Sequence, residues 1–323
     1  MKIRNLLPYA FALILLLWIV FILSREGRTL ELIYALKPMD GLISILIALV
    51  LFSINGSQIR FLVRRASGLS MPWEDSLILP ASMNLWSYIL PFRGGLFYSM
   101  FYIRSRYRVE LTQGFSIGLF TFLLSTSLAG FLGLYLSLNS LEFRWSWVIT
   151  SLFLILSPIL ASQAIRISAF LMKRDIGKLG GPIRAFHRTM ENFNAHLRDG
   201  RSTSFILLTI VLSIVIYIYW VYWAVRAFDI DMSTTSVILL AIMLRLSVIA
   251  RFIPGNIGVQ ELISGAAVEF AGGNVSEGIL VALFIRLSAL LPALIMGIYS
   301  FLANIEAFRS ISVKELWTKF RDF

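Results

Sequence analysis

Seven apolar runs, each about as long as a membrane is thick, constrain this chain more than any other feature of its sequence. A helix needs roughly 20 apolar residues to cross the hydrocarbon core of a bilayer. The composition agrees, because 58% of the residues are hydrophobic, 15% are charged and the mean hydropathy is +0.80. A water-soluble fold is therefore excluded. The runs lie near residues 6–24, 41–59, 113–138, 146–170, 203–227, 235–252 and 276–304.

Two further apolar stretches, 73–103 and 254–273, are broken by proline and glycine. Proline removes a backbone hydrogen bond and glycine tolerates turns, so these stretches predict discontinuous or re-entrant segments. We expect an all-α polytopic membrane protein with about seven or eight transmembrane helices and these two broken segments, in a single domain over 1–323. The residues at the breaks are Pro91, Gly94, Gly95, Pro254, Gly255 and Gly258.

The basic residues predict how the chain is oriented. Lysine and arginine accumulate after the second run, before the third and in the loop 171–202, and short basic loops are typical of the cytoplasmic side. We expect a cytoplasmic N-terminus in the plasma membrane. The stretch 73–103 must then return to the side where it starts, as a re-entrant hairpin or as two short crossings. A cytoplasmic tail over 305–323 requires 254–273 to count as one crossing or as half of a pair.

The same basic residues explain the net charge of +11. In a soluble protein this charge would suggest nucleic acid, but here it lies mostly between apolar runs, so no nucleic-acid partner is expected. We interpret 171–202 as a solvated cytoplasmic loop that contains a short helix and touches anionic lipid. The first run resembles a signal peptide but lacks a small-residue cleavage site, which indicates a retained span.

Several kinds of chemistry are disfavoured. The chain has no cysteine, and its two histidines, His187 and His196, lie in a polar stretch without a nearby carboxylate cluster, so no metal site is expected. No phosphate-binding loop of the ATPase type occurs, and no cofactor is expected.

The two breaks carry the most information about a site. Irregular backbone at membrane depth is tolerated only where protein or a water-filled cavity satisfies its polar groups. Pro91 and Pro254 stand 163 positions apart, which favours an internal, inverted repeat with a site between the halves; ordinary interfacial loops are the alternative. Each break carries an arginine and an asparagine that could bind an anion near exposed backbone N–H groups. These candidate substrate-binding residues are Asn84 and Arg93 at the first break, and Arg251 and Asn256 at the second.

Two arginines lie deep in apolar runs. Arg286 is about 15 Å into the last run, and Arg245 is equally deep in the sixth. An arginine at that depth costs roughly 2.5 to 3.5 kcal/mol, so each should face a polar cavity or a partner. The candidate partners of these two arginines are Glu261, Glu269 and an acidic group of the substrate. A structural ion pair, such as that of Arg286 with Glu261, is the alternative to a binding role. The simple alternative for Arg93 and Arg251 is contact with the membrane interface.

The residues also resemble a known family. Pro254-Gly255-Asn256-Ile257-Gly258-Val259-Gln260-Glu261 is similar to the Pro-Gly-x-x-Gly-Val-x-Glu signature of the lysylphosphatidylglycerol synthase transmembrane region family, whose members are also called flippase-like domain proteins. The segment 84–95 resembles the other characteristic segment of that family, and Arg286 matches a recurring arginine. One departure is Leu96-Phe97, where the family commonly has an acidic residue after the glycine. The resemblance implies re-entrant helices and a membrane domain that moves lipid between leaflets.

Three classes of function are compatible with these features. The first is a translocator of a phospholipid or lipid-linked intermediate with an anionic headgroup, working through an arginine-lined cavity. The second is a membrane-embedded transferase acting on a lipid phosphate, with Glu261 or Glu269 as general base. It would not be an aminoacyl transferase, because we expect no aminoacyl-transferase domain in the roughly 20 residues that follow the last run. The third is an accessory subunit that docks an envelope-synthesis enzyme through 171–202. We expect membrane lipids as partners, with homo-oligomerisation possible.

Overall fold

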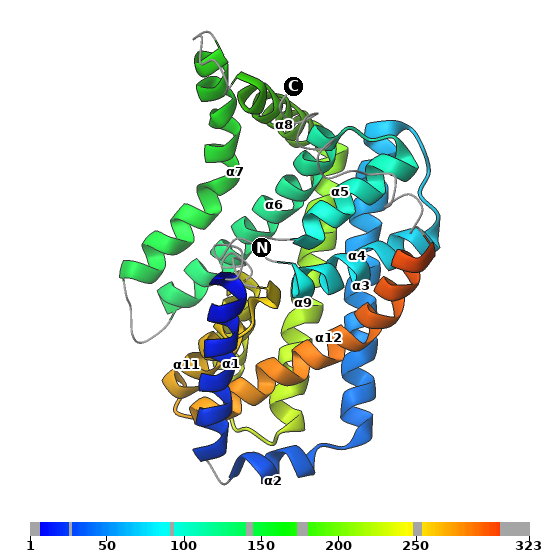
Figure 1. The fold of residues 1–323 in the computed structure, drawn as a ribbon. Helices are drawn as coiled ribbons and strands as arrows, with labels where there is room; N and C mark the ends of the chain where they lie inside the picture. The colour runs from blue at the N-terminus through cyan, green and yellow to red at the C-terminus, as the bar shows by residue number, and fades with distance from the viewer. Residues whose placement is uncertain are drawn as a thin grey trace.

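The computed structural model describes residues 7–25, 28–90, 94–139, 145–172, 180–247 and 254–303. Within these ranges the chain forms helices joined by short connections and contains no strand, which confirms the expected all-α membrane fold (Figure 1). The candidate residues Pro91, Arg93 and Arg251 and the tail 305–323 lie outside the described residues.

In the described part of the chain, five helices are long and apolar enough to cross a membrane. At 28 to 30 residues each, they measure about 42 to 45 Å along their axes, more than the roughly 30 Å of hydrocarbon. Large apolar side chains on their outer faces are exposed, such as Leu208 and Ile295 at 68% each, as expected of a lipid-facing surface. The five are α3 (Pro38–Ser67), α6 (Leu111–Asn139), α7 (Trp145–Met172), α9 (Gly200–Ala227) and α12 (Val275–Ala303).

The remaining helices are shorter. The first apolar run forms α1, and the sixth run, expected over 235–252, is a described helix only as far as Leu246. Its 13 residues span about 20 Å, too little to cross the hydrocarbon alone. Both broken stretches are interrupted where proline and glycine predict: 73–103 becomes two short helices, and 254–273 becomes a 3-10 turn followed by one short helix. The shorter helices are α1 (Leu7–Arg25), α2 (Arg28–Ala35), α4 (Trp73–Ile89), α5 (Gly94–Tyr107), α8 (Gly180–Arg198), α10 (Thr234–Leu246), the 3-10 turn η4 (Pro254–Asn256) and α11 (Val259–Phe270).

One order of helices occurs twice along the chain. A long helix, two short helices separated by a proline-glycine break, and a second long helix form α3–α4–α5–α6 and again α9–α10–α11–α12. Each helix of the second unit begins between 161 and 165 residues after its counterpart. This spacing agrees with the 163 residues that separate Pro91 from Pro254. The fold therefore contains the internal repeat that the two breaks predict.

The two units run in opposite directions. Three hydrogen bonds join α3 and the helix that corresponds to it, α9, and the residue numbers fall on one helix as they rise on the other: Trp223 to Asp40, Trp220 to Ser44 and Gln58 to Thr209. The long helices α6 and α12 likewise run in opposite senses (Figure 1). The repeat is thus inverted, an arrangement found in many membrane transporters.

The loop 171–202 contains a longer helix than the sequence indicates. Helix α8 is packed against α6, α7 and α9, with Phe193 fully buried, so this segment is part of the folded domain rather than a free loop. Asp199 caps the following helix, α9, and accepts a hydrogen bond of 2.6 Å from the Ser202 hydroxyl. That bond, together with the Arg65 guanidinium 3.4 Å away, lowers the pKa of Asp199.

Close approach of the helix backbones holds the hairpin α4–α5 in place. A Cβ atom at Gly56 of α3 would lie 1.8 Å from the carbonyl oxygen of Ser76 in α4. A Cβ atom at Gly95 of α5 would lie 1.9 Å from the carbonyl oxygen of Met83 in α4. Neither carbonyl can move without disturbing its own helix. Small residues at such contacts let membrane helices pack tightly.

We expect Gly56→Ala to lower the midpoint of thermal unfolding of the purified protein, because the added methyl overlaps the α4 backbone and overpacking costs roughly 1–3 kcal/mol. Gly41→Ala is the matched control, since it lies in the same helix with no atom within 4 Å of the new Cβ. Equal midpoints for the two variants would contradict this packing.

Candidate functional site

The two breaks, far apart in sequence, meet in space. Tyr88 at the end of α4 lies against Gly255 in η4, where a Cβ atom would come within 2.5 Å of the tyrosine ring. Gly255 also has φ of +63°, in the left-handed region that favours glycine. A larger residue at position 255 would therefore be strained and would push η4 away from Tyr88 at the end of α4.

Glu261 and Arg286 fasten the second break to α12. Arg286 Nη1 lies 2.9 Å from Glu261 Oε1, and both side chains are buried, at 8% and 1% exposure. Glu261 Oε2 accepts a hydrogen bond of 2.8 Å from the Gly258 N–H, so the carboxylate also caps the start of α11. Arg286 Nη2 donates to the Asn256 carbonyl at 3.2 Å and to Gln260 Oε1 at 3.1 Å. We call Arg286, Glu261, Gln260 and Asn256 the turn clamp.

Asn256 closes the turn clamp from the other side. It is buried, and its Nδ2 donates to the Ser247 carbonyl at 3.0 Å, which ties η4 to the end of α10. Its φ of +57° places it in the left-handed region, which asparagine tolerates better than most residues. Asn256 therefore shapes the backbone at the break. It does not line the cavity described next.

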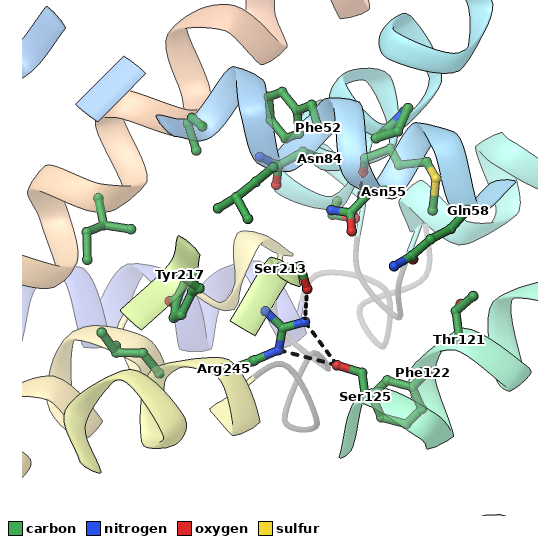
Figure 2. Close-up of a pocket in the computed structure, with 18 of the residues that line it drawn as sticks. Phe52, Asn55, Gln58, Asn84, Thr121, Phe122, Ser125, Ser213, Tyr217 and Arg245 are labelled. Atoms are coloured by element: carbon green, nitrogen blue, oxygen red, sulfur yellow. Dashed lines mark hydrogen bonds between the residues drawn. The ribbon is translucent and has the colours of Figure 1, made fainter. Parts of the chain in front are cut away.

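A cavity of about 430 Å³ lies between the two repeat units. Its walls come from α3, α4, α5, α6, α9, α10, α11 and α12. Asn55, in the middle of the membrane-length helix α3, is exposed because it borders this space. Figure 2 shows the side chains of α3 on one side and Arg245 on the other. The polar and charged lining residues are Asn55, Gln58, Asn84, Ser87, Tyr88, Thr121, Ser125, Thr126, Ser213, Tyr217, Trp220, Arg245, Gln260 and Arg286.

Arg245 faces this cavity without a carboxylate partner among the described residues. Its Nε and Nη2 donate to Ser125 Oγ at 3.3 and 3.1 Å, and Nη2 also donates to Ser213 Oγ at 2.9 Å (Figure 2). Its guanidinium lies 5.8 Å from the centre of the Tyr217 ring. No described residue accepts from the two N–H groups of Nη1. A guanidinium held by two hydroxyls keeps its full charge and spare donors, which suits a phosphate or carboxylate.

The residues that line the cavity are related by the inverted repeat. Residues at equivalent positions of the two units border the cavity together, so the space lies where matching helix faces meet. Their chemistry differs, however, because both arginines among the described lining residues come from the second unit, whereas three of the four carboxamides come from the first. Pairs at offsets of 161 to 164 residues include Asn55 and Tyr217, Gln58 and Trp220, Asn84 and Arg245, and Phe122 and Arg286.

The structure separates the predicted site residues into two groups. Asn84, Arg245 and Arg286 line the cavity, whereas Glu261 and Asn256 belong to the turn clamp behind it. Of the two acidic residues proposed for Arg286, Glu261 forms the ion pair. Glu269 is exposed near the end of α11 and does not line the cavity. Gly94, Gly95, Pro254, Gly255 and Gly258 lie at the ends of the helices that the breaks separate.

Several lining residues were not singled out from sequence. Asn55 and Gln58 are three residues apart in an apolar run, and Ser213 and Tyr217 are four apart in another, spacings that place each pair on one helix face. Polar residues repeated at such spacing in a membrane span are the signal that could have identified them. Ser125 also lines the cavity, and its hydroxyl accepts hydrogen bonds from Arg245.

The turn clamp generates a stability prediction. Removing one partner of a buried ion pair leaves the other charge uncompensated and costs roughly 3–5 kcal/mol. We therefore expect Glu261→Gln and Arg286→Met each to lower the midpoint of thermal unfolding in detergent. The double variant should lose clearly less than the two single losses together, because no unpaired charge remains. Glu269→Gln, on the exposed side of α11, is the control, and strictly additive losses would contradict a clamp.

The amino-acid sequence also matches a family of membrane domains. Residues 6–297 of 323 match the family described as the lysylphosphatidylglycerol synthase TM region. This range includes both breaks, the turn clamp and the cavity. No curated protein and no solved structure is significantly similar to the chain. The match confirms the resemblance seen at residues 254–261, and the chain belongs to the lysylphosphatidylglycerol synthase transmembrane region family.

Proposed function

We propose that this protein moves a membrane lipid with an anionic headgroup between the two leaflets, and that the headgroup binds Arg245 in the cavity. The observation that carries the proposal is the Arg245 guanidinium inside a membrane domain, in a cavity, with no carboxylate partner and no acceptor for its two Nη1 N–H groups among the described residues. Family membership supports a function connected with membrane lipid. Burial of an uncompensated arginine is costly, and a bound anion would offset that cost.

The inverted repeat supports movement rather than binding alone. In transporters built this way, one repeat or hairpin moves against the other, and a fixed site between them opens to each side in turn. Here the hairpin α4–α5 and the hairpin α10–α11 touch at Tyr88 and Gly255, next to the cavity. Relative movement of these two tips would change access to Arg245. The turn clamp would keep the second hairpin attached to α12 during that movement.

The hairpins also suggest how the chain crosses the plasma membrane. If both return to the side where they start, the crossings are α1, α3, α6, α7, α9 and α12. Both termini and α8 then lie on one side, and α2 lies on the other. The basic residues around α8 favour the cytoplasm for the shared side.

We expect Arg245→Gln to slow transfer of phosphatidylglycerol by about tenfold to a hundredfold. The variant loses charge-assisted hydrogen bonds worth roughly 1.5–3 kcal/mol to an anion. The measurement is protein-dependent loss of leaflet asymmetry in liposomes that contain acyl-labelled phosphatidylglycerol.

Arg226→Gln is the matched control, because Arg226 is an exposed arginine near the end of α9 that contacts Tyr222 and does not line the cavity. It should transfer lipid at the unmodified rate. An Arg245→Gln protein that folds normally and transfers lipid as fast as this control would refute the assignment of Arg245.

The proposed orientation can be tested by single-cysteine labelling, because the chain has no cysteine of its own. Tyr34 in α2 is 85% exposed, and Ala195 in α8 is exposed. A membrane-impermeant maleimide should label Tyr34→Cys on intact cells and Ala195→Cys only after permeabilisation. Labelling of both from one side would be inconsistent with the crossings proposed here.

A further inference from the structure

The described residues that line the cavity carry more positive than negative charge. Among the described residues, its charged lining residues are Arg245 and Arg286, and no aspartate or glutamate lines it. Arg286 is already neutralised by Glu261 at 2.9 Å. The described lining residues therefore present one uncompensated positive charge, that of Arg245, and no negative charge.

The wall opposite Arg245 is rich in carboxamides. Asn55 and Asn84 line the cavity, and neither side chain forms a hydrogen bond with a described residue. Gln58 lies beside them and donates one hydrogen bond, of 3.1 Å, to Thr209. A carboxamide both donates and accepts, as does a hydroxyl group, so unpartnered carboxamides suit an uncharged, hydroxyl-bearing ligand. They give an ammonium group only neutral acceptors.

A cationic headgroup lacks a suitable place in this cavity. An ammonium group would lie in the same space as Arg245, and no described lining residue supplies a carboxylate to balance it. Like charges brought together are strongly unfavourable. An aromatic face could hold a cation instead. Both tyrosine rings that line the cavity already lie beside an arginine: Tyr217 beside Arg245 and Tyr88 beside Arg286, each with 5.8 Å between guanidinium and ring centre. The other lining rings, Phe52, Phe122 and Trp220, would have to hold the cation without help from a carboxylate among the described lining residues.

The size of the cavity suits a small headgroup. A volume of about 430 Å³ is at the lower end of the roughly 300–1,000 Å³ typical of sites for small molecules. It suits a phosphate with one small polar group attached. A long oligosaccharide would not fit.

We propose that the cavity selects a lipid phosphate bearing a small, uncharged, hydroxyl-rich group and rejects an aminoacylated, cationic headgroup. This inference rests on the proposed function, because it names the substrate class of the same site. Arg245 would bind the phosphate, and Asn55 and Asn84 would bind the hydroxyls. Two lipid sources share this chemistry: a glycerol headgroup on a phospholipid, and a single sugar on a polyprenyl phosphate.

The test compares lipids that differ only in the headgroup. The full chain in liposomes is given acyl-labelled phosphatidylglycerol, lysylphosphatidylglycerol or phosphatidic acid, and in a separate arm a polyprenyl-phosphate hexose. Phosphatidylglycerol or the hexose lipid should move at least about tenfold faster than lysylphosphatidylglycerol, equivalent to roughly 1.4 kcal/mol. Phosphatidic acid, which lacks the hydroxyl-rich group, should also move more slowly. The faster of the two favoured lipids identifies the source.

A single substitution should weaken the selectivity. Asn55→Asp keeps the shape of the side chain but adds a carboxylate to the cavity wall that faces Arg245 (Figure 2). We expect the ratio of phosphatidylglycerol to lysylphosphatidylglycerol transfer to fall by about tenfold or more. Asn274→Asp makes the same change at an exposed position between α11 and α12, outside the cavity, and should leave the ratio unchanged.

A binding measurement separates this inference from the proposed function. Short-chain phosphatidylglycerol should raise the midpoint of thermal unfolding in detergent, and lysylphosphatidylglycerol should not. If no lipid is transferred but this difference in binding persists, translocation is refuted and the selectivity stands. If lysylphosphatidylglycerol is transferred or bound as well as phosphatidylglycerol, the selectivity is refuted and translocation can still stand.

Discussion

The buried contact between Arg286 and the turn before α11 is the interaction on which the rest of the site depends. A helix that stops inside a membrane leaves backbone N–H and carbonyl groups without partners, and no lipid can supply them. Arg286 binds the Asn256 carbonyl, and Glu261 binds the Gly258 N–H, while their opposite charges compensate each other. This pairing allows the chain to be non-helical at the break, and it fixes η4 against Tyr88 of the first hairpin.

The inverted repeat explains why a cavity forms at all. Two units with matching helices meet face to face, and equivalent positions on both line the space between them. The sequences of the units have diverged, so Asn84 in one corresponds to Arg245 in the other, and Asn55 corresponds to Tyr217. Among the described lining residues, the first unit is therefore neutral and rich in hydrogen-bonding groups, and the second carries both arginines. A headgroup with two chemically different parts fits such a space better than a uniform one.

The two deep arginines show how similar sequence signals can differ in role. Each lies in an apolar run and each was expected to face a polar cavity or a partner. Arg286 has a carboxylate, a carbonyl and a carboxamide as partners, so it is mainly structural although it borders the cavity. Arg245 has two serine hydroxyls and an aromatic ring, and it keeps its charge uncompensated. This difference in role comes from the partner residues, which lie on α6 and α9 for Arg245 and on α11 and the preceding turn for Arg286. The sequence around either arginine does not reveal these partners.

The sequence alone was sufficient for the class of fold, the positions of the long helices, both breaks, the repeat and the motif around Glu261, because hydrophobic length, proline and glycine act locally along the chain. It also narrowed the partner of Arg286 to a short set that included Glu261. Only the tertiary structure decided that the short helices α10 and α11 form a hairpin, that Asn55 and Gln58 share a cavity with Arg245, and that Glu261 is already engaged. These features depend on which faces of distant helices meet, and that is decided by packing between segments more than a hundred residues apart.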